Sequence, residues 1–353
     1  MKQLEKNYRR IVIKIGSSLF GKATALGNII DQIADLLKQK FEIVVVSSGA
    51  IAQGMSILGI ENRPKELSHL QAVAALGQNE LMNIYREGLA NRGLKCGQVL
   101  LTWEDFDDRK RYLNAKNTIT RLVQLGIVPI INENDTVSVD EIKFGDNDRL
   151  SALVSSLISA DILIILSDVD GLLDRNKTVI SLVNEITPQI RKLAYPTDKK
   201  VCVGGMVTKI EAAKIAVESG IPCVIANGRK NDIILSIIKE PEKHGTLFRS
   251  QKSLTERDRW IAFGAKIKGR IYVDAGAKEA LVNGSKSLLS VGVTKVEGNF
   301  KLGDTVGVID DKDSEFARGK VNFPADELKE IKGRRAKKEV IHRDNLVITW
   351  KAR

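Results

Sequence analysis

The first 240 residues contain a series of short apolar runs, and each run stops at small or polar side chains. The runs cover residues 11–15, 43–46, 127–131, 162–166 and 222–226. Apolar runs of this length, bounded in this way, predict buried β-strands. Stretches with helical periodicity separate most of them. The alternation predicts an α/β fold, in which a mainly parallel sheet carries helices on both faces.

The segments with helical periodicity are 26–40, 68–91, 114–125, 151–159, 210–220 and 231–239, and a further short strand is expected at 99–101. In open parallel sheets, the ligand crevice lies outside the carboxyl ends of the strands. Several polar residues lie beyond or close to the expected strand ends, namely Lys14, Ser48, Asp135, Asp146, Asp168 and Lys209. Their convergence predicts a ligand site at that edge of the sheet.

The densest polar group follows the apolar run that ends at Ile131. Residues 132–135 read NEND, and after nine intervening residues 145–148 read GDND. Carboxylates accept hydrogen bonds from an ammonium group, and asparagine amides donate to carboxylates without adding like charge. A zwitterionic amino acid needs both kinds of partner. The alternative is a solvated loop rich in turn formers, but it does not explain two dense clusters after so apolar a strand.

Three features suit a phosphate group. Small residues at 47–49 let backbone N–H groups approach an anion, although a plain tight turn gives the same pattern. Gly204-Gly205 precedes an expected helix, whose free N–H groups and dipole favour phosphate. Lys14 lies inside an apolar strand, where an ammonium group needs an anionic partner unless the strand is at an edge. Residues 16–23 lack the closing Ser or Thr of a P-loop, which we therefore reject.

Composition excludes several classes of protein. The longest apolar stretches are too short to span a membrane, and the N-terminus lacks an apolar signal region. The three cysteines lie far apart, which argues against a disulfide framework and fits the cytoplasm. The three histidines are also scattered, so a zinc site is not expected.

The C-terminal part differs in texture and in charge. Residues 249–353 hold 23 Lys and Arg against 15 Asp and Glu, whereas the preceding residues hold 32 against 29. Short alternating segments there, punctuated by Gly and Asp, predict a small β-rich barrel. We expect domains at 1–250 and 269–353, joined by a linker at 251–268. The basic balance raises nucleic acid as a partner, or simply a cationic surface.

Together these motifs resemble the glutamate 5-kinase family of amino-acid kinases, which carries a C-terminal PUA domain. The matching segments of the body are 13–18 (IKIGSS), 47–52 (SSGAIA), 131–135 (INEND), 145–148 (GDND) and 204–209 (GGMVTK). Those of the tail are 273–277, 298–304 and 342–344. The resemblance implies an αβα sandwich followed by a small β-barrel-like PUA domain. It also implies transfer of the γ-phosphoryl of ATP to the side-chain carboxylate of L-glutamate, which is the first step of L-proline biosynthesis.

The resemblance assigns roles to individual residues. It implies catalytic roles for Lys14, Lys209 and Asp148, of which Asp148 is expected to orient the lysines. Substrate contacts are implied for Ser48, Gly49, Asn132, Asp135, Asp146 and Asn147. The nucleotide is expected beside Lys14, Ser167, Asp168, Val203, Gly204, Gly205, Met206, Val207, Thr208 and Lys209. Mg²⁺ is expected with ATP, held largely by phosphates and water.

The chemistry agrees with this assignment. Phosphoryl transfer requires mainly positioning and charge neutralisation, so lysines are needed where two anions meet. A carboxylate nucleophile is already ionised at neutral pH and needs no general base. The remaining alternatives are another amino-acid kinase, acting on aspartate, acetylglutamate or a nucleotide, and an RNA-binding protein that uses the PUA-like domain. The acidic run 104–108 resembles the loop that the family associates with proline feedback, so the resemblance implies proline as an inhibitor, and we also expect a homo-oligomer.

Overall fold

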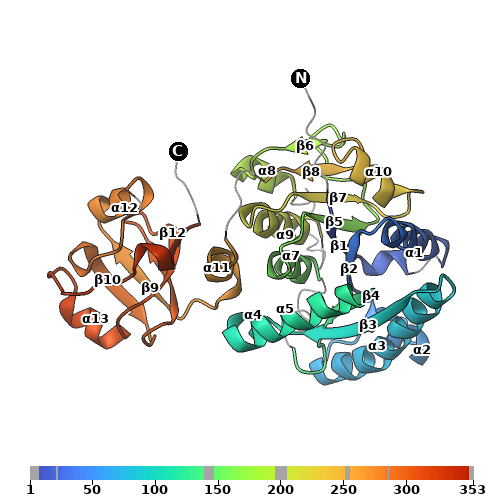
Figure 1. Ribbon diagram of the computed structural model, residues 1–353, viewed down its shortest axis with the longest axis horizontal. Helices are drawn as coiled ribbons and strands as arrows, with labels where there is room; N and C mark the ends of the chain where they lie inside the picture. Colours follow the sequence, from blue (N-terminus) through green and yellow to red (C-terminus); the bar gives the residue numbers. More distant parts are fainter. Residues whose placement is uncertain are drawn as a thin grey trace. The chain divides into compact units, whose positions relative to one another are not determined.

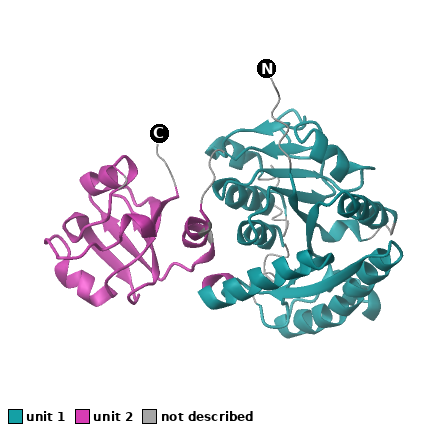
Figure 2. Cartoon of the chain, viewed as in Figure 1, with its two compact units in different colours: residues 1–105, 109–253 teal, residues 106–108, 254–353 magenta. Residues whose placement is uncertain are grey.

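The computed structural model describes residues 8–20, 23–138, 147–194, 205–250, 255–284 and 286–349 of the chain (Figure 1). The chain divides into two compact units, shown in different colours in Figure 2. Unit 1 comprises Met1–Asp105 and Arg109–Ser253, and unit 2 comprises Phe106–Asp108 and Leu254–Arg353. Each unit is described by itself below.

The described part of unit 1 is built on an eight-stranded sheet with the order β3-β4-β2-β1-β5-β7-β8-β6. The strands are β1 (Arg10–Ile15), β2 (Glu42–Ser47), β3 (Lys95–Leu101), β4 (Ile127–Glu133), β5 (Ile162–Ser167), β6 (Leu182–Val183), β7 (Cys223–Asn227) and β8 (Thr246–Phe248). Neighbours from β3 to β7 are parallel, and β8 runs antiparallel to β7. The predicted α/β class with a mainly parallel sheet is confirmed.

Helices cover both faces of this sheet. The described helices along this part of the chain are α1 (Ala23–Lys38), α2 (Ala50–Leu58), α3 (Leu67–Ala90), α4 (Trp103–Asp107), α5 (Arg109–Gln124), α7 (Asp148–Leu157), α8 (Pro188–Leu193), α9 (Met206–Glu218) and α10 (Ile233–Lys239), and α4 ends within the segment assigned to unit 2. In Figure 1, α1 and α10 lie on one side of the sheet, and α7 and α9 on the other. In agreement, α1 contacts β2 and α10, whereas α7 contacts β1, β5 and α9.

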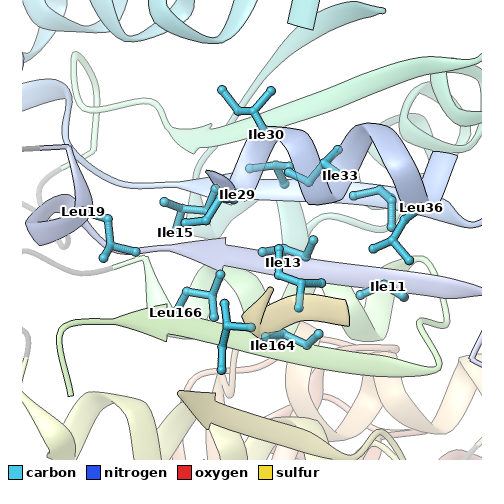
Figure 3. Close-up of a cluster of buried hydrophobic side chains, with 14 of the residues drawn as sticks. Ile11, Ile13, Ile15, Leu19, Ile29, Ile30, Ile33, Leu36, Ile164 and Leu166 are labelled. Carbon is cyan, nitrogen blue, oxygen red and sulfur yellow. The ribbon is translucent and has the colours of Figure 1, made fainter. Parts of the chain in front are cut away.

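A cluster of buried aliphatic side chains fixes the orientation of β1. Ile11, Ile13 and Ile15 are fully buried and share a cluster with side chains of α1 and β5 (Figure 3). Burying each such side chain stabilises the fold by about 1.5–3 kcal/mol. Side chains alternate across a strand, so Val12 and Lys14 face the other side of the sheet, toward α7. The core therefore determines where the Lys14 ammonium group goes.

Strand register brings the polar strand ends to one edge of the sheet. Lys14 is paired with Val46 of β2 and with Ile165 of β5. Val46 is in turn paired with Ile131 of β4, and Ile165 with Ile225 of β7. Just beyond this row, each chain segment changes from apolar to small or polar residues. The polar ends of β4, β2, β1, β5 and β7 thus lie in one row, along the edge of the sheet that was predicted to carry a ligand site.

The elements differ from the sequence-based expectation in detail. The strand expected at 99–101 begins at Lys95, because it pairs with β4 along its whole length from Lys95 opposite Ile127. The helix expected at 114–125 begins at Arg109, and α4 precedes it. The acidic run 104–108 lies on and just after α4, and its role in proline feedback stays a prediction. Helix α2 was not predicted.

Unit 2 has a sheet and a core of its own. In its described part the strands β9 (Gly269–Val273), β10 (Val293–Gly298), β11 (Thr305–Ile309), β12 (Glu315–Lys320) and β13 (Leu346–Ile348) have the order β10-β9-β11-β12-β13. The helices are α11 (Glu256–Arg259), α12 (Ala275–Val282) and α13 (Ala325–Ile331), with a π-helical turn at Trp260–Gly264. Phe300, Phe316 and Leu328 are fully buried members of this core. The β-rich character predicted for the tail is present.

Among the residues described, no helix is both long enough and apolar enough to cross a membrane.

Candidate functional site

A buried ionic cluster of Lys14, Asp148 and Lys209 lies at the carboxyl edge of the sheet. The Lys14 Nζ lies 2.6 Å from Asp148 Oδ1, and the Lys209 Nζ lies 3.1 Å from Asp148 Oδ2. The Asp148 side chain is fully buried, and both lysines are nearly so. Buried charges of this kind require charged partners. The edge-strand explanation for Lys14 is wrong, because β1 lies between β2 and β5.

Two helix N-termini position this cluster. Asp148 is the first residue of α7, where a carboxylate interacts favourably with the helix dipole. Lys209 lies in the first turns of α9, which begins after Gly205. The hydroxyl of Thr208, the residue before Lys209, lies 3.0 Å from Asp148 Oδ2 and 2.9 Å from the Gly205 carbonyl oxygen. The three ionic side chains carry two positive charges and one negative charge, a balance suited to an anionic ligand.

A chain of side-chain amides extends from the ionic cluster. Asn147, next to Asp148, donates from Nδ2 to the Ser47 carbonyl oxygen at 2.6 Å and also to Asn132 Oδ1. The Asn132 Nδ2 donates to Gln78 Oε1 at 2.7 Å. Asn132 and Asn147 are almost completely buried. Asn132 and Asn147 were named from the sequence, but Gln78 was missed, because a lone glutamine on a helix gives no signal of a site.

Several buried polar atoms at this edge have no hydrogen-bond partner within the described part of the chain. They are Ser48 Oγ, Gln78 Nε2, Asp135 Oδ1 and Asn147 Oδ1. More than nine-tenths of buried backbone polar groups, and most buried side-chain ones, find a partner in folded proteins. Three of these atoms, Ser48 Oγ, Asp135 Oδ1 and Asn147 Oδ1, lie near the ends of β2 and β4, where a polar ligand would complete their hydrogen bonding. We refer to the place of these three atoms as the acceptor pocket.

Asp135 has an unusual electrostatic environment within the acceptor pocket. Burial, and then the neighbouring Glu133 carboxylate, raise the pKa of Asp135 to about 7, with Arg63 acting in the opposite direction. Glu133 itself accepts a hydrogen bond from the Ser138 hydroxyl. A buried carboxyl group with a raised pKa favours a positively charged partner, such as an ammonium group.

Gly49 separates the pocket from the start of α2. Its φ of 113° lies in the left-handed region that favours glycine. A Cβ at this position would also lie 3.3 Å from the Phe20 ring. The chain can therefore turn directly from Ser48 at the end of β2 into α2, whose first N–H groups face the same edge. A larger residue at this turn would strain the backbone.

Of the residues expected to border a nucleotide, the described ones include Ser167 and Asp168 at the end of β5 and Gly205 to Lys209 at the start of α9. Ser167 ends β5 and is buried, whereas Asp168 is exposed. Gly205 caps α9, and Met206, Val207 and Thr208 are half-buried at its start. Leu19 lies in the hydrophobic core, consistent with the rejection of a P-loop at 16–23. Asp146, Val203 and Gly204 lie outside the described residues.

No group of three or more His, Cys, Asp or Glu side chains able to hold a metal ion occurs among the residues that the structure describes.

Comparison with known proteins shows similarity over the whole chain. Residues 9–227 match the amino acid kinase family, and residues 269–342 match the PUA domain. A glutamate 5-kinase of Thermoanaerobacter sp. (strain X514) is 46% identical and aligns with 96% of this chain and 97% of its own length. A glutamate 5-kinase of Carboxydothermus hydrogenoformans is 44% identical, with 99% and 100% aligned.

Solved structures show a similar fold at much lower identity. N-acetylglutamate synthase from Neisseria gonorrhoeae, complexed with coenzyme A and N-acetyl-glutamate, has a TM-score of 0.53 and 13% identity. The match covers 70% of this chain and 60% of that protein. At this identity the similarity concerns the fold alone.

Proposed function

The chain belongs to the amino acid kinase family and, within it, to the glutamate 5-kinases, and from this we infer that it is an ATP-dependent glutamate 5-kinase. It transfers the γ-phosphoryl group of ATP to the side-chain carboxylate of L-glutamate, giving L-glutamate 5-phosphate, the first step of L-proline biosynthesis. The observation that carries this function is the buried ionic cluster joined, through Asn147 and Asp148, to the acceptor pocket. The similarity does not favour the alternative kinases or an RNA-binding function.

The ionic cluster supports a role in transfer of the phosphoryl group. The reaction brings a carboxylate and a phosphate together, so negative charge has to be neutralised along the line of transfer. Asp148 holds the ammonium groups of Lys14 and Lys209 on its two oxygens, one on each. We propose that both lysines stabilise the phosphoryl group in flight and that Asp148 fixes their positions. The acceptor carboxylate is ionised at neutral pH, so no general base takes part.

The acceptor pocket supports recognition of a zwitterion. Asp135 and the Asn147 Oδ1 supply acceptors for the substrate ammonium group, while Ser48 and the start of α2 supply donors for its carboxylate. With this division of roles, we propose that glutamate binds between the ends of β2 and β4, beside the ionic cluster. Asn132, whose own amide already has both partners, then acts by holding Asn147 rather than by being the main contact.

The nucleotide is proposed to lie along Ser167, Asp168 and the start of α9, with its phosphates toward Lys14 and Lys209. The N–H groups of a helix N-terminus suit phosphate oxygens. Kinases that use ATP require a divalent cation, and we propose Mg²⁺ held by the phosphates and water. When bound, the ion neutralises part of the phosphate charge.

The location, assembly and regulation of the enzyme are also proposals. The scattered cysteines fit the cytoplasm. Self-association as a homo-oligomer, feedback inhibition by proline and RNA binding by unit 2 stay predictions from the sequence.

The function is tested by measuring ADP release from purified protein against a panel of amino acids, with hydroxylamine present to trap the acyl phosphate. We expect hydroxamate to form with L-glutamate and to require both ATP and a divalent cation. Aspartate and acetylglutamate serve as controls for the related kinases. Absence of glutamate-dependent hydroxamate would overturn the function, and preference for another amino acid would reassign it.

Two substitutions test the acceptor pocket and the ionic cluster separately. Asp135→Ala removes a charged acceptor, and loss of a hydrogen bond to a charged group costs about 1.5–3 kcal/mol. The KM for glutamate should therefore rise about 10- to 100-fold, with little change in the KM for ATP. Lys209→Ala should chiefly lower kcat, by about 10²–10³, because the negative charge that Lys209 stabilises on the phosphoryl group develops during transfer. Equal changes in both KM values for Asp135→Ala would show a structural role instead.

A further inference from the structure

The orientation of the buried amides follows from a single backbone group. The oxygen and nitrogen of an amide can exchange places without changing the shape of a side chain, so its partners decide its orientation. A carbonyl oxygen can only accept, and therefore the Asn147 atom 2.6 Å from the Ser47 carbonyl oxygen is its Nδ2. The same Nδ2 faces Asn132, which must present Oδ1.

The remaining orientations follow step by step. Because Asn132 presents Oδ1 to Asn147, its Nδ2 points the other way and donates to Gln78 Oε1 at 2.7 Å. We call the hydrogen-bonded amides of Asn147, Asn132 and Gln78 the relay. It leaves one acceptor without a partner at one end, Asn147 Oδ1, and one donor without a partner at the other end, Gln78 Nε2. Both atoms are buried, so the polarity of the relay determines what the acceptor pocket offers a ligand.

The packing of α3 on α2 positions Gln78. A Cβ at Gly77 would lie 1.8 Å from the Ala50 carbonyl oxygen and 2.3 Å from the Gly54 nitrogen. The two helices can approach this closely only because Gly77 has no side chain. Its neighbour Gln78 then reaches the end of β4 from a rigid helix. Ala50 is the first residue of α2, immediately after Gly49 of the pocket.

We propose that Gln78 is a positioning residue of the acceptor pocket, which holds Asn132, and through it Asn147, in the orientation that presents Asn147 Oδ1 to the substrate ammonium group. The inference rests on the proposed glutamate kinase function. Without Gln78, the Asn132 Nδ2 loses its acceptor, and rotation of the Asn132 amide becomes less costly. A rotated Asn132 would turn its NH₂ toward the Asn147 NH₂, placing two donors face to face.

The size of the effect follows from the strength of one neutral hydrogen bond. Such a bond contributes about 1 kcal/mol, a factor of about 5 in an equilibrium constant. The Ser47 carbonyl oxygen continues to hold Asn147 in part. We therefore expect Gln78→Met, which keeps the length of the side chain, to raise the KM for glutamate about 3- to 5-fold. The KM for ATP should change less than about twofold.

A double-mutant cycle distinguishes positioning from direct contact. The full chain is assayed as wild type, Gln78→Met, Asn132→Ala and the double variant. Because Gln78 acts through Asn132, Gln78→Met should produce no further rise in the glutamate KM when Asn132→Ala is present. Asn79→Met, at the exposed neighbouring position of α3, is the matched control and should behave as the wild type.

Three outcomes would overturn the inference alone. In each of them the wild type still turns over glutamate, so the proposed function is unaffected. These outcomes are an unchanged glutamate KM in Gln78→Met, an equal rise in the KM for ATP, and additive effects in the double variant. The last would mean that Gln78 contacts the substrate itself.

If Gln78→Met fails to fold, judged by its unfolding temperature, Gln78→Asn replaces it. A side chain shorter by one methylene cannot make the 2.7 Å hydrogen bond to Asn132. A wild type without glutamate turnover would remove the proposed function and this inference together.

Discussion

Asp135 is the residue whose ionisation should be visible in solution. Burial and the neighbouring Glu133 raise its pKa to about 7 in the folded chain, whereas an unfolded chain has the ordinary value near 3.8. Between these values the folded chain holds a proton that the unfolded chain has released. The free energy of unfolding should therefore fall as pH rises from 4 to 7, by at most about 1.4 kcal/mol per pH unit from this group. Urea unfolding of wild type and Asp135→Asn measures the contribution, because the variant lacks the titrating group. Equal pH slopes in the two proteins would contradict the assignment.

Substrate affinity should change with pH in the opposite direction. An ammonium group binds ionised Asp135 better than protonated Asp135. The KM for glutamate should fall as pH rises from 6 to 8, since the carboxyl group ionises over this range. In Asp135→Asn the KM should be higher and nearly independent of pH over this range. A wild-type KM that rises with pH would exclude Asp135 as the ammonium partner.

The main chemistry-bearing residues could be named from the sequence because each lies at a strand end or a helix start. Lys14 could be named because an ammonium group inside an apolar strand demands a partner. The sequence also indicated that Asp148 faces the lysines, and the ion pairs have that arrangement. Gln78 and the Ser138–Glu133 contact could not be predicted, because both depend on how separate elements approach in space. The roles of all these residues stay predictions until they are tested kinetically.

At the scale of elements, the crossing of α2 and α3 depends on two glycines. A Cβ at Gly54 would lie 1.9 Å from the Val73 carbonyl oxygen, and one at Gly77 would lie 1.8 Å from that of Ala50. These contacts are with backbone atoms, which cannot move aside without separating the helices. Overpacking of this kind typically costs about 1–3 kcal/mol and occasionally more. The crossing is also the feature that brings Gln78 to the pocket.

Gly77→Ala should therefore lower the free energy of unfolding by about 3 kcal/mol or more, and raise the KM for glutamate. Gly27→Ala is the matched control, because Gly27 lies inside α1 with no atom within 4 Å of a Cβ. The control should be more stable than wild type by about 0.5–1 kcal/mol, since alanine favours helix. Urea midpoints of both variants measure the difference. Similar stability in the two variants would mean that α2 and α3 can separate freely.

The buried strands of unit 1 could be predicted because they are continuous apolar runs, and the long helices because their apolar residues have a clear helical period. Helix α2 could not, since Gly54 in its interior reads as a helix breaker, although the structure uses it for close packing. The short strands β6 and β8 also escaped prediction. A strand of two or three residues has too little pattern to distinguish it from a loop.

At the scale of the whole molecule, positive charge is concentrated in residues 249–353. An exposed part of it follows α13, where the described chain carries Lys332, Arg334, Arg335, Lys337 and Lys338. Elsewhere in unit 2, a cavity of about 520 Å³ has carboxylates in its lining, from Asp274, Asp310, Asp311 and Asp313. Phosphates would be attracted to the basic segment and repelled by the cavity. Charge alone therefore predicts weak binding of polyanions without sequence recognition.

We expect filter binding to detect RNA at low salt, with a dissociation constant weaker than about 10⁻⁶ M at physiological salt. The affinity should fall steeply with salt, because released counterions drive the binding. Arg334→Gln combined with Arg335→Gln should weaken binding and leave the kinase kinetics unchanged. Lys38→Gln with Lys243→Gln removes the same charge from exposed lysines of unit 1 and should weaken binding less. Binding at about 10⁻⁸ M or tighter that distinguishes RNA sequences would instead establish specific recognition by unit 2. That result would show a site that the charge distribution alone does not reveal.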